Sequence, residues 1–385
     1  MDQVEIAAMR FRIERNQAGE HFLGRHRHVG ILQRPDSRQV SCRQARRQAR
    51  GVNALSVTGK GPAMDFDVSL SDIQAAATRI AGRVRRTPTF FSAGISARLG
   101  VETVVKVESL QLGGSFKVRG CFNKLMQLSE EELSKGIVTV SGGNHAIAVS
   151  FVARALGSRA LVLMPKNAAP FNIAMTRQMG GEIELCEDSV EAFARAEDHA
   201  RRGMINVHSY DDPAIIAGHG TTGLEMASDA SGRLDHVFIS IGGGGFSAGV
   251  AAALKGLDPA VRIWGVETEG ATTMTQALAA GQPVPIKPTS IARTLGAPFA
   301  TERTLAAARR FLEEIVVVPD AEAVREIPWV LQHGRVLLEP AASCVLAAAL
   351  ARKDAFKPGE RVGLVLCGSN VALEDIEGWR KQFGV

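Results

Sequence analysis

The sequence predicts an α/β fold built on parallel sheets with helices on both faces. Short runs of apolar and β-branched residues alternate with Ala-rich helical patterns, and such alternation indicates crossovers between parallel strands. Several runs are continuously apolar, which indicates strands covered on both faces. We expect strands at 101–107, 136–140, 160–164, 182–186, 235–241, 262–266 and 361–367. We expect helices at 189–202, 246–255, 302–314 and 340–352.

Length and composition limit the classes to which this protein can belong. The chain has 385 residues, 45% hydrophobic and 22% charged, so its length allows two or three domains and it is neither disordered throughout nor a fibre. No apolar run approaches the ~18 residues of a membrane-spanning helix. With one Tyr and three Trp, a base-stacking nucleic-acid platform is not expected. The five cysteines have no paired spacing, which favours reduced thiols and a cytoplasmic location.

The N-terminal segment differs from the rest of the chain. Residues 1–63 hold 11 Arg and one Lys against five acidic residues, a net charge of +7. The remaining residues hold 33 basic and 35 acidic side chains, a net charge of −2. The segment has no sustained apolar period, so we expect 1–64 to be a disordered basic extension. A nucleic-acid-binding arm is an alternative, and a transit peptide is disfavoured by the early acidic residues.

The clearest candidate site is the run Gly242–Gly245 between an expected strand and an expected helix. Glycine permits a tight turn and a close approach of the backbone to a ligand. The N–H groups of such a turn and the following helix N-terminus form a cradle for phosphate. Residues 243–248 also match the G-x-G-x-x-A pattern of dinucleotide sites, and Glu267 ends the next strand. On this segment alone, an NAD-dependent oxidoreductase built on residues 242–267 is an alternative.

Three further segments carry side chains that could react with or bind a ligand. Lys117 follows a Gly-Gly-Ser turn between Phe116 and Val118, and partial burial there lowers a lysine pKa and creates a nucleophile for a Schiff base. The sequence SGGNH at 141–145 follows a strand, and its hydroxyl, amide and backbone donors suit a carboxylate. The sequence CGSN at 367–370 ends an apolar strand, where open α/β sheets bind ligands.

Together these segments resemble the fold-type II pyridoxal-phosphate enzymes, in particular the threonine/serine dehydratase and serine racemase group. The likeness covers about residues 65–385 and rests on the motifs ESLQLGGSFKVRG, SGGNHA, AGHGTTGLE, GGGGFSAG, SIARTLG, LLEPAA and LCGSN in the family's order. The resemblance implies a tryptophan synthase β-like fold of two open twisted α/β domains, with the cofactor in the cleft. It implies a large domain over 65–127 and 207–385 and a small inserted domain over 128–206.

The resemblance also implies roles for individual residues. Lys117 would hold pyridoxal 5'-phosphate as a Schiff base beside Phe116, and Gly242–Gly245 would bind its phosphate. Asn144 would bond the 3-hydroxyl oxygen of the cofactor, and Cys367 would lie beside its ring nitrogen. The residues implied for the substrate carboxylate are Ser141, Gly142, Gly143, Asn144 and His145.

Two family features are incomplete in this sequence. Some members bind a divalent cation through a Glu, a backbone carbonyl four residues on and an Asp two further. Glu267 and Ala271 match the first two positions, but Thr273 replaces the Asp, so we expect no metal. In the racemases of the group, the second acid/base is a Ser directly after the first Ser of the glycine turn, and here that position is Gly142.

The sequence therefore predicts a pyridoxal-phosphate-dependent ammonia-lyase. It would eliminate water from L-threonine, L-serine or a related 3-hydroxy amino acid and yield a 2-oxo acid and ammonia. Within the group, serine racemase and 3-hydroxyaspartate or phenylserine dehydratase are alternatives. We expect an amino-acid substrate, no nucleic-acid or membrane partner, and a homodimer or homotetramer.

Overall fold

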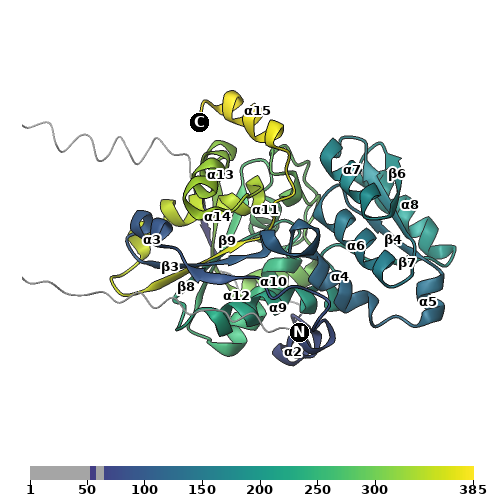
Figure 1. Cartoon of the computed structure of the whole chain (residues 1–385), viewed down its shortest axis with the longest axis horizontal. Coiled ribbons are helices and arrows are strands. Elements are labelled where there is room, and N and C mark those ends of the chain that lie inside the picture. The colour runs from purple at the N-terminus through teal and green to yellow at the C-terminus, as the bar shows by residue number, and fades with distance from the viewer. Residues whose placement is uncertain (1–52, 58–64) are drawn as a thin grey trace, which may run out of the picture. The chain divides into compact units, whose positions relative to one another are not determined.

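Two β-sheets form the framework of the computed structural model, which describes residues 53–57 and 65–385 (Figure 1). The strands of the larger sheet are, in spatial order, β1 (Asn53–Ser56), β10 (Leu312–Val318), β9 (Arg262–Thr268), β8 (His236–Ser240), β11 (Arg361–Leu366), β3 (Glu102–Val107) and β2 (Thr89–Phe91). The five central strands pair in parallel, and the two edge strands pair antiparallel. The α/β class is confirmed.

The smaller sheet is entirely parallel, and both of its faces are buried. Its strands, in spatial order, are β6 (Gly181–Cys186), β5 (Ala160–Pro165), β4 (Ile137–Val140) and β7 (Ile205–Asn206). Ile137 and Val162 pack into one apolar cluster with α6 (Asn144–Ala155), whereas Val138 and Leu163 pack into another with α8 (Ser189–Arg201). Alternate strand residues therefore meet helices on opposite faces, which explains the continuous apolar runs.

The remaining helices complete the layers around the two sheets (Figure 1). Those of the smaller sheet are α5 (Glu130–Ser134) and α7 (Pro170–Gln178). Those in the segments before and after it are α2 (Leu70–Arg79), α3 (Ala93–Leu99), α4 (Lys117–Leu125), α9 (Pro213–Asp229), α10 (Gly245–Leu257), α11 (Thr273–Ala280), α12 (Glu302–Phe311), α13 (Asp320–Gly334), α14 (Pro340–Ala351) and α15 (Leu373–Phe383). Within the described ranges, no helix is both long and apolar enough to cross a membrane.

One expected helix is too long. The helix expected at 302–314 ends at Phe311, and the next residue begins β10. The run from Ile315 to Val318 is β-branched, and β-branched side chains pack well on a sheet. Ile315, Val316 and Val318 are fully buried, so tertiary packing places this segment in the larger sheet.

The expectation of a disordered extension over residues 1–64 is wrong for β1. Residues 53–56 pair antiparallel with β10, with Leu55 opposite Ile315. Without β1, the outer edge of β10 would present unpaired backbone groups, and edge strands of this kind attract a pairing partner. Residues 1–52 and 58–64 lie outside the described part of the chain.

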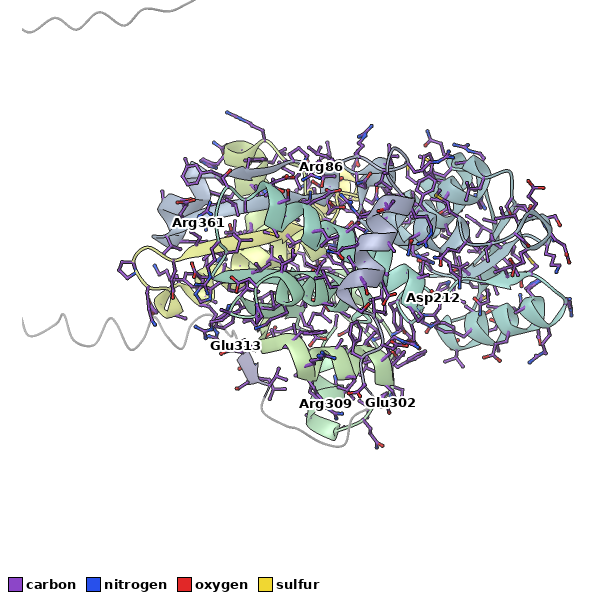
Figure 2. The ribbon with its side chains drawn as sticks, turned by 90° about the horizontal axis from the view of Figure 1, so that it is seen from below. Arg86, Asp212, Glu302, Arg309, Glu313 and Arg361 are labelled. Atoms are coloured by element: carbon purple, nitrogen blue, oxygen red, sulfur yellow. The ribbon has the colours of Figure 1, made fainter. Side chains whose placement is uncertain are left out.

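Helix α4, which begins at Lys117, is held by charged groups. Arg119 is fully buried and pairs with Glu108 at 2.8 Å and with Glu225 at 2.7 Å. Asp212 accepts backbone N–H groups at the start of α9 and pairs with Lys124 of α4 at 2.8 Å (Figure 2). Because breaking a buried ion pair leaves an uncompensated charge, these contacts fix α4 firmly.

The described residues all belong to one compact unit. The division into a large domain (65–127 and 207–385) and a small inserted domain (128–206) therefore stays a prediction. Every strand of the smaller sheet lies between residues 137 and 206.

Candidate active site

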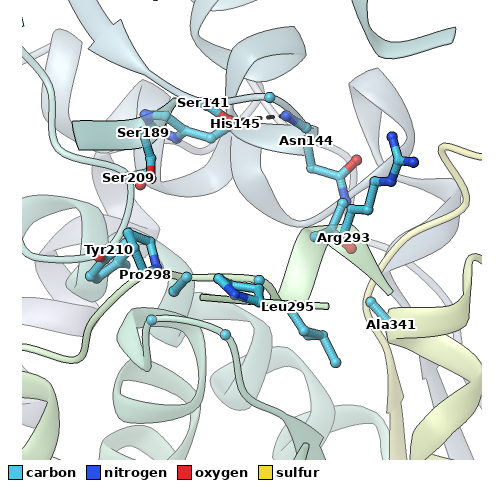
Figure 3. A pocket seen from close by; sticks show the side chains of 18 of the residues that line it. Ser141, Asn144, His145, Ser189, Ser209, Tyr210, Arg293, Leu295, Pro298 and Ala341 are labelled. Atoms are coloured by element: carbon cyan, nitrogen blue, oxygen red, sulfur yellow. Dashed lines mark hydrogen bonds between the residues drawn. The ribbon is translucent and has the colours of Figure 1, made fainter. Parts of the chain in front are cut away.

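A cavity of about 500 Å³ lies at the carboxyl ends of strands from both sheets. Ser141, Asn144 and His145 lie along one wall, and Leu295 and Pro298 lie across from them (Figure 3). The sequence-predicted residues that line it are Phe116, Lys117, Ser141, Gly142, Gly143, Asn144, His145, Gly242, Gly243, Gly244, Gly245 and Cys367. Segments far apart in the sequence thus meet in one place, whereas Glu267 and Ala271 do not line the cavity.

Lys117 is the first residue of α4, and its amine reaches the cavity. Its Nζ donates to the carbonyl oxygen of Ser209 at 2.7 Å. The side chain is partly exposed, toward the cavity, and protein atoms enclose the rest of it. This burial lowers the pKa of Lys117 from 10.5 to about 8, because the ammonium loses hydration. A useful fraction of the amine is therefore neutral and nucleophilic near neutral pH.

The glycine run lies against Tyr210, a residue that the sequence analysis missed. A Cβ atom on Gly243 would meet the ring of Tyr210, and one on Gly245 would meet its backbone. Gly244 has a φ of +94° and immediately precedes the 13-residue helix α10, so the turn needs glycine there for its conformation. The backbone N–H groups and the helix N-terminus form the anion cradle that the sequence predicts.

The turn after β4 presents donors on the opposite wall. The N–H of Gly143 donates to Oγ of Ser141 at 3.2 Å, which leaves the hydroxyl hydrogen of Ser141 free to donate. Nδ2 of Asn172 donates to the carbonyl oxygen of Gly142 at 3.1 Å and fixes the turn. These groups remain the predicted carboxylate site.

Asn144 belongs to a buried polar network centred on Glu339. Nδ2 of Asn144 donates to the two carboxylate oxygens of Glu339 at 2.9 and 3.1 Å, and its Oδ1 accepts from Asn370 at 2.7 Å. Thr294 donates to the same carboxylate at 2.8 Å. Burial raises the pKa of Glu339 to about 7. Since Nδ2 carries two hydrogens, one can bind Glu339 while the other is left for a second acceptor, and the predicted bond to the cofactor stays a prediction.

Two buried histidines lie close to Lys117. Burial lowers the pKa of His145 and of His219 well below 6.5, so both rings are neutral. Nδ1 of His145 lies 3.7 Å from Sγ of Cys121, and the ring of His219 packs edge-on against Phe116 at 4.8 Å. A neutral imidazole offers one N–H and no charge, which weakens the predicted role of His145 in binding a carboxylate.

The divalent-cation site of the family does not fit this chain. The two oxygens of Glu267 accept from N–H of Met274 at 2.7 Å and from N–H and Oγ1 of Thr275 at 3.0 and 2.6 Å. Thr273 donates its hydroxyl to the carbonyl oxygen of Ala297 at 2.7 Å. Glu267 therefore accepts N–H groups in the first turn of α11. It is fully buried and does not line the cavity, so a ribose hydroxyl there cannot reach it and the NAD alternative has no support.

The fold and the site define a class of enzyme, and comparison with known proteins identifies it. The chain belongs to the family described as pyridoxal-phosphate dependent enzyme, whose model matches residues 80–368. It is 33% identical over 316 residues to an L-threonine ammonia-lyase of Thermotoga maritima, covering 80% of this chain and 77% of that one. It is 36% identical to a phenylserine dehydratase of Ralstonia pickettii, covering 78% and 93% of the two chains. The structure of maize serine racemase matches with a TM-score of 0.75 and 30% identity, covering 82% and 97%.

The donor set of the cavity suits pyridoxal phosphate. A neutralisable buried amine, Lys117, shares the cavity with an anion cradle that only glycine can form at Gly244 and Gly245. Cys367, at the end of β11, lies on the same cavity wall as Ser240. When bound, pyridoxal phosphate supplies an electron sink for negative charge at the α-carbon of an amino acid.

Proposed function

We propose that this protein removes water from L-threonine or L-serine, or from a related 3-hydroxy amino acid, and releases a 2-oxo acid and ammonia. The water lost from the α and β carbons is regained when the resulting enamine hydrolyses, so the net products are the oxo acid and ammonia alone. Lys117 carries the proposal, because a lysine amine with a pKa near 8 can both hold pyridoxal phosphate and accept the α-proton.

The residues that line the cavity would bind the cofactor, bind the substrate carboxylate and accept the α-proton. Gly242–Gly245 would hold the phosphate through backbone N–H groups, and Asn144, fixed by Glu339, would donate to the ring oxygen. Ser141 and N–H groups of its turn would hold the substrate carboxylate. With the substrate fixed in this way, the freed Nζ of Lys117 takes the α-proton from one face.

The direct test uses purified full-length protein supplied with pyridoxal phosphate. We expect a visible absorption band that borohydride abolishes, and release of 2-oxo acid and ammonia in equal amounts from L-threonine or L-serine. A panel that adds L-threo-3-hydroxyaspartate and L-phenylserine identifies the preferred side chain. Protein that binds no pyridoxal phosphate, or forms no oxo acid from any of these substrates, contradicts the proposal.

Elimination is expected to exceed racemisation, because Lys117 can serve only one face of the substrate and Gly142 stands where the racemases of the group have their second acid/base. Gly142 carries no side chain, and its φ lies outside the left-handed region. A Cβ atom there would lie 3.3 Å from Cβ of Ala168, 3.7 Å from Cδ of Pro165 and 3.9 Å from Cα of Ala168, with no contact under 3.0 Å. Gly142→Ser should therefore fold and raise D-serine formation from L-serine by about 10²-fold. Chiral chromatography measures both enantiomers. D-serine forming in the wild type as fast as pyruvate would show that an unidentified base serves the second face.

The rate at which Lys117 captures pyridoxal phosphate should follow its lowered pKa. Only the neutral amine attacks a carbonyl, so the capture rate of cofactor-free protein should rise about tenfold per pH unit below pH 8 and level off above it. Stopped-flow absorption over about two pH units on either side measures this profile. A midpoint near the ordinary lysine value of 10.5 would contradict the lowered pKa.

We also propose a cytoplasmic homodimer or homotetramer. The described cysteines are buried free thiols, which suits a reducing compartment. The edge strand β2 carries Phe90 and Phe91, 39% and 54% exposed, and an apolar strand edge of this kind suits pairing with a second copy. Phe91→Glu should reduce the molar mass measured by light scattering, whereas Leu373→Glu on α15 should not. An unchanged mass for Phe91→Glu means that another surface joins the subunits.

A further inference from the structure

Ser240 and Cys367 form a hydrogen-bonded pair in the wall of the cavity. Ser240 is the last residue of β8, and Cys367 follows the last residue of the neighbouring strand β11. Both side chains are buried, with 4% and 3% of their surface exposed, and both line the cavity. The hydroxyl of Ser240 donates to Sγ of Cys367 at 3.4 Å. The register of two parallel strands thus places a hydroxyl beside the thiol.

The thiol hydrogen of Cys367 already has an acceptor. Sγ of Cys367 donates to the carbonyl oxygen of Ala341 at 3.5 Å, and Sγ of Cys344 donates to the same oxygen at 3.2 Å. Burial raises the pKa of both thiols above their ordinary value, so both stay protonated. With its hydrogen on Ala341, the sulfur of Cys367 offers only lone pairs to other groups.

We propose that Ser240 is the hydroxyl donor of the cofactor site, and that its hydroxyl donates to the ring nitrogen of pyridoxal phosphate, beside Cys367. The proposal rests on the proposed function and on the family resemblance, which implies that this nitrogen lies beside Cys367. A serine hydroxyl can rotate from the sulfur to a neutral nitrogen, and it is a stronger donor than a thiol. Cys367 would then keep its bond to Ala341, and Ser240 would be a positioning residue for both the sulfur and the ring.

As a chemical consequence, the ring nitrogen would accept a hydrogen bond from an uncharged hydroxyl. A carboxylate at this position would keep the nitrogen protonated and draw more charge into the ring. A hydroxyl provides directionality without a negative charge, so less electron density moves into the ring and loss of the β-hydroxyl is favoured over other fates of the α-carbon.

The test compares full-length Ser240→Ala with Ser343→Ala, a matched control. Ser343 is a fully buried serine on α14 that donates to the carbonyl oxygen of Ala323 and does not line the cavity. We expect Ser240→Ala to shift the infrared S–H band of Cys367, which Cys367→Ala identifies by its disappearance. We expect the Kd of pyridoxal phosphate to rise about tenfold and its absorption band to move, as loss of one buried hydrogen bond implies. Ser343→Ala should leave all three unchanged.

The effects of Ser240→Ala and Cys367→Ala on Kd should be non-additive, because the two side chains contact each other and removal of Cys367 alters the position of the Ser240 hydroxyl. An S–H shift with an unchanged Kd and absorption band overturns the proposal while leaving the proposed function intact. A wild type that binds no pyridoxal phosphate overturns the proposed function itself. Melting temperatures of both serine variants show whether a change in Kd reflects loss of folding.

Discussion

Replacement of Lys117 by alanine is expected to lower kcat for oxo-acid formation by more than about 10³-fold. The variant loses both the amine that holds pyridoxal phosphate and the base that accepts the α-proton. No second amine replaces it, because among the described lysines that line the cavity the other, Lys287, is exposed at the surface. The absorption band that borohydride abolishes should vanish together with the activity, since both depend on Nζ of Lys117.

Lys255→Ala provides the control for this substitution. Lys255 lies on α10, its Nζ donates to the carbonyl oxygen of Pro259, and it does not line the cavity. The control should keep the absorption band and the activity of the wild type. Retention of normal elimination by Lys117→Ala would show that another residue holds the cofactor.

Several central strands could be predicted because burial on both faces of the sheet requires apolar side chains at consecutive positions. A strand buried on both faces needs a continuous apolar run, and β8, β9 and β11 contain one. The edge strands β1 and β2 are short, and each is held by a single neighbouring strand. Their sequences carry no such signal, so only the assembled sheet reveals them. Strand β10 was assigned in part to a helix because Ala306–Ala308 and the following residues continue a helical pattern into its start.

The parts of the candidate site that could be predicted are those where the local sequence determines a turn. The residues that contact these parts through tertiary packing could not be predicted. The glycine run, Lys117 and the turn after β4 each follow a strand or a glycine turn, and the structure brings them to one cavity. Ser209, which accepts from Lys117, and Tyr210, which packs on the glycine run, carry no local signal of these contacts. Such partners depend on how separate strands and helices pack.

Gly245→Ala is expected to weaken binding of pyridoxal phosphate by about 10- to 100-fold. Overpacking typically costs roughly 1–3 kcal/mol, and a cost of this size in the cofactor-bound geometry raises Kd by such a factor. The added methyl would meet the carbonyl oxygen, carbonyl carbon and Cα of Tyr210. These are backbone atoms, so no side-chain rotation relieves the contact. The backbone of the glycine turn, or that of Tyr210, must shift, and the N–H groups of the cradle would then move away from the phosphate.

Gly378→Ala is the matched control for this loss of affinity. Gly378 lies within α15, and a Cβ atom there meets nothing within 4 Å. Alanine in a helix interior is favoured over glycine by roughly 0.5–1 kcal/mol, so this variant should melt at or above the wild-type temperature and bind the cofactor normally. Titration of cofactor-free protein with pyridoxal phosphate gives Kd for each variant. An unchanged Kd in Gly245→Ala, with the fold intact, would mean that the phosphate does not lie against this turn, because the close packing on Tyr210 leaves the turn no room to keep its geometry.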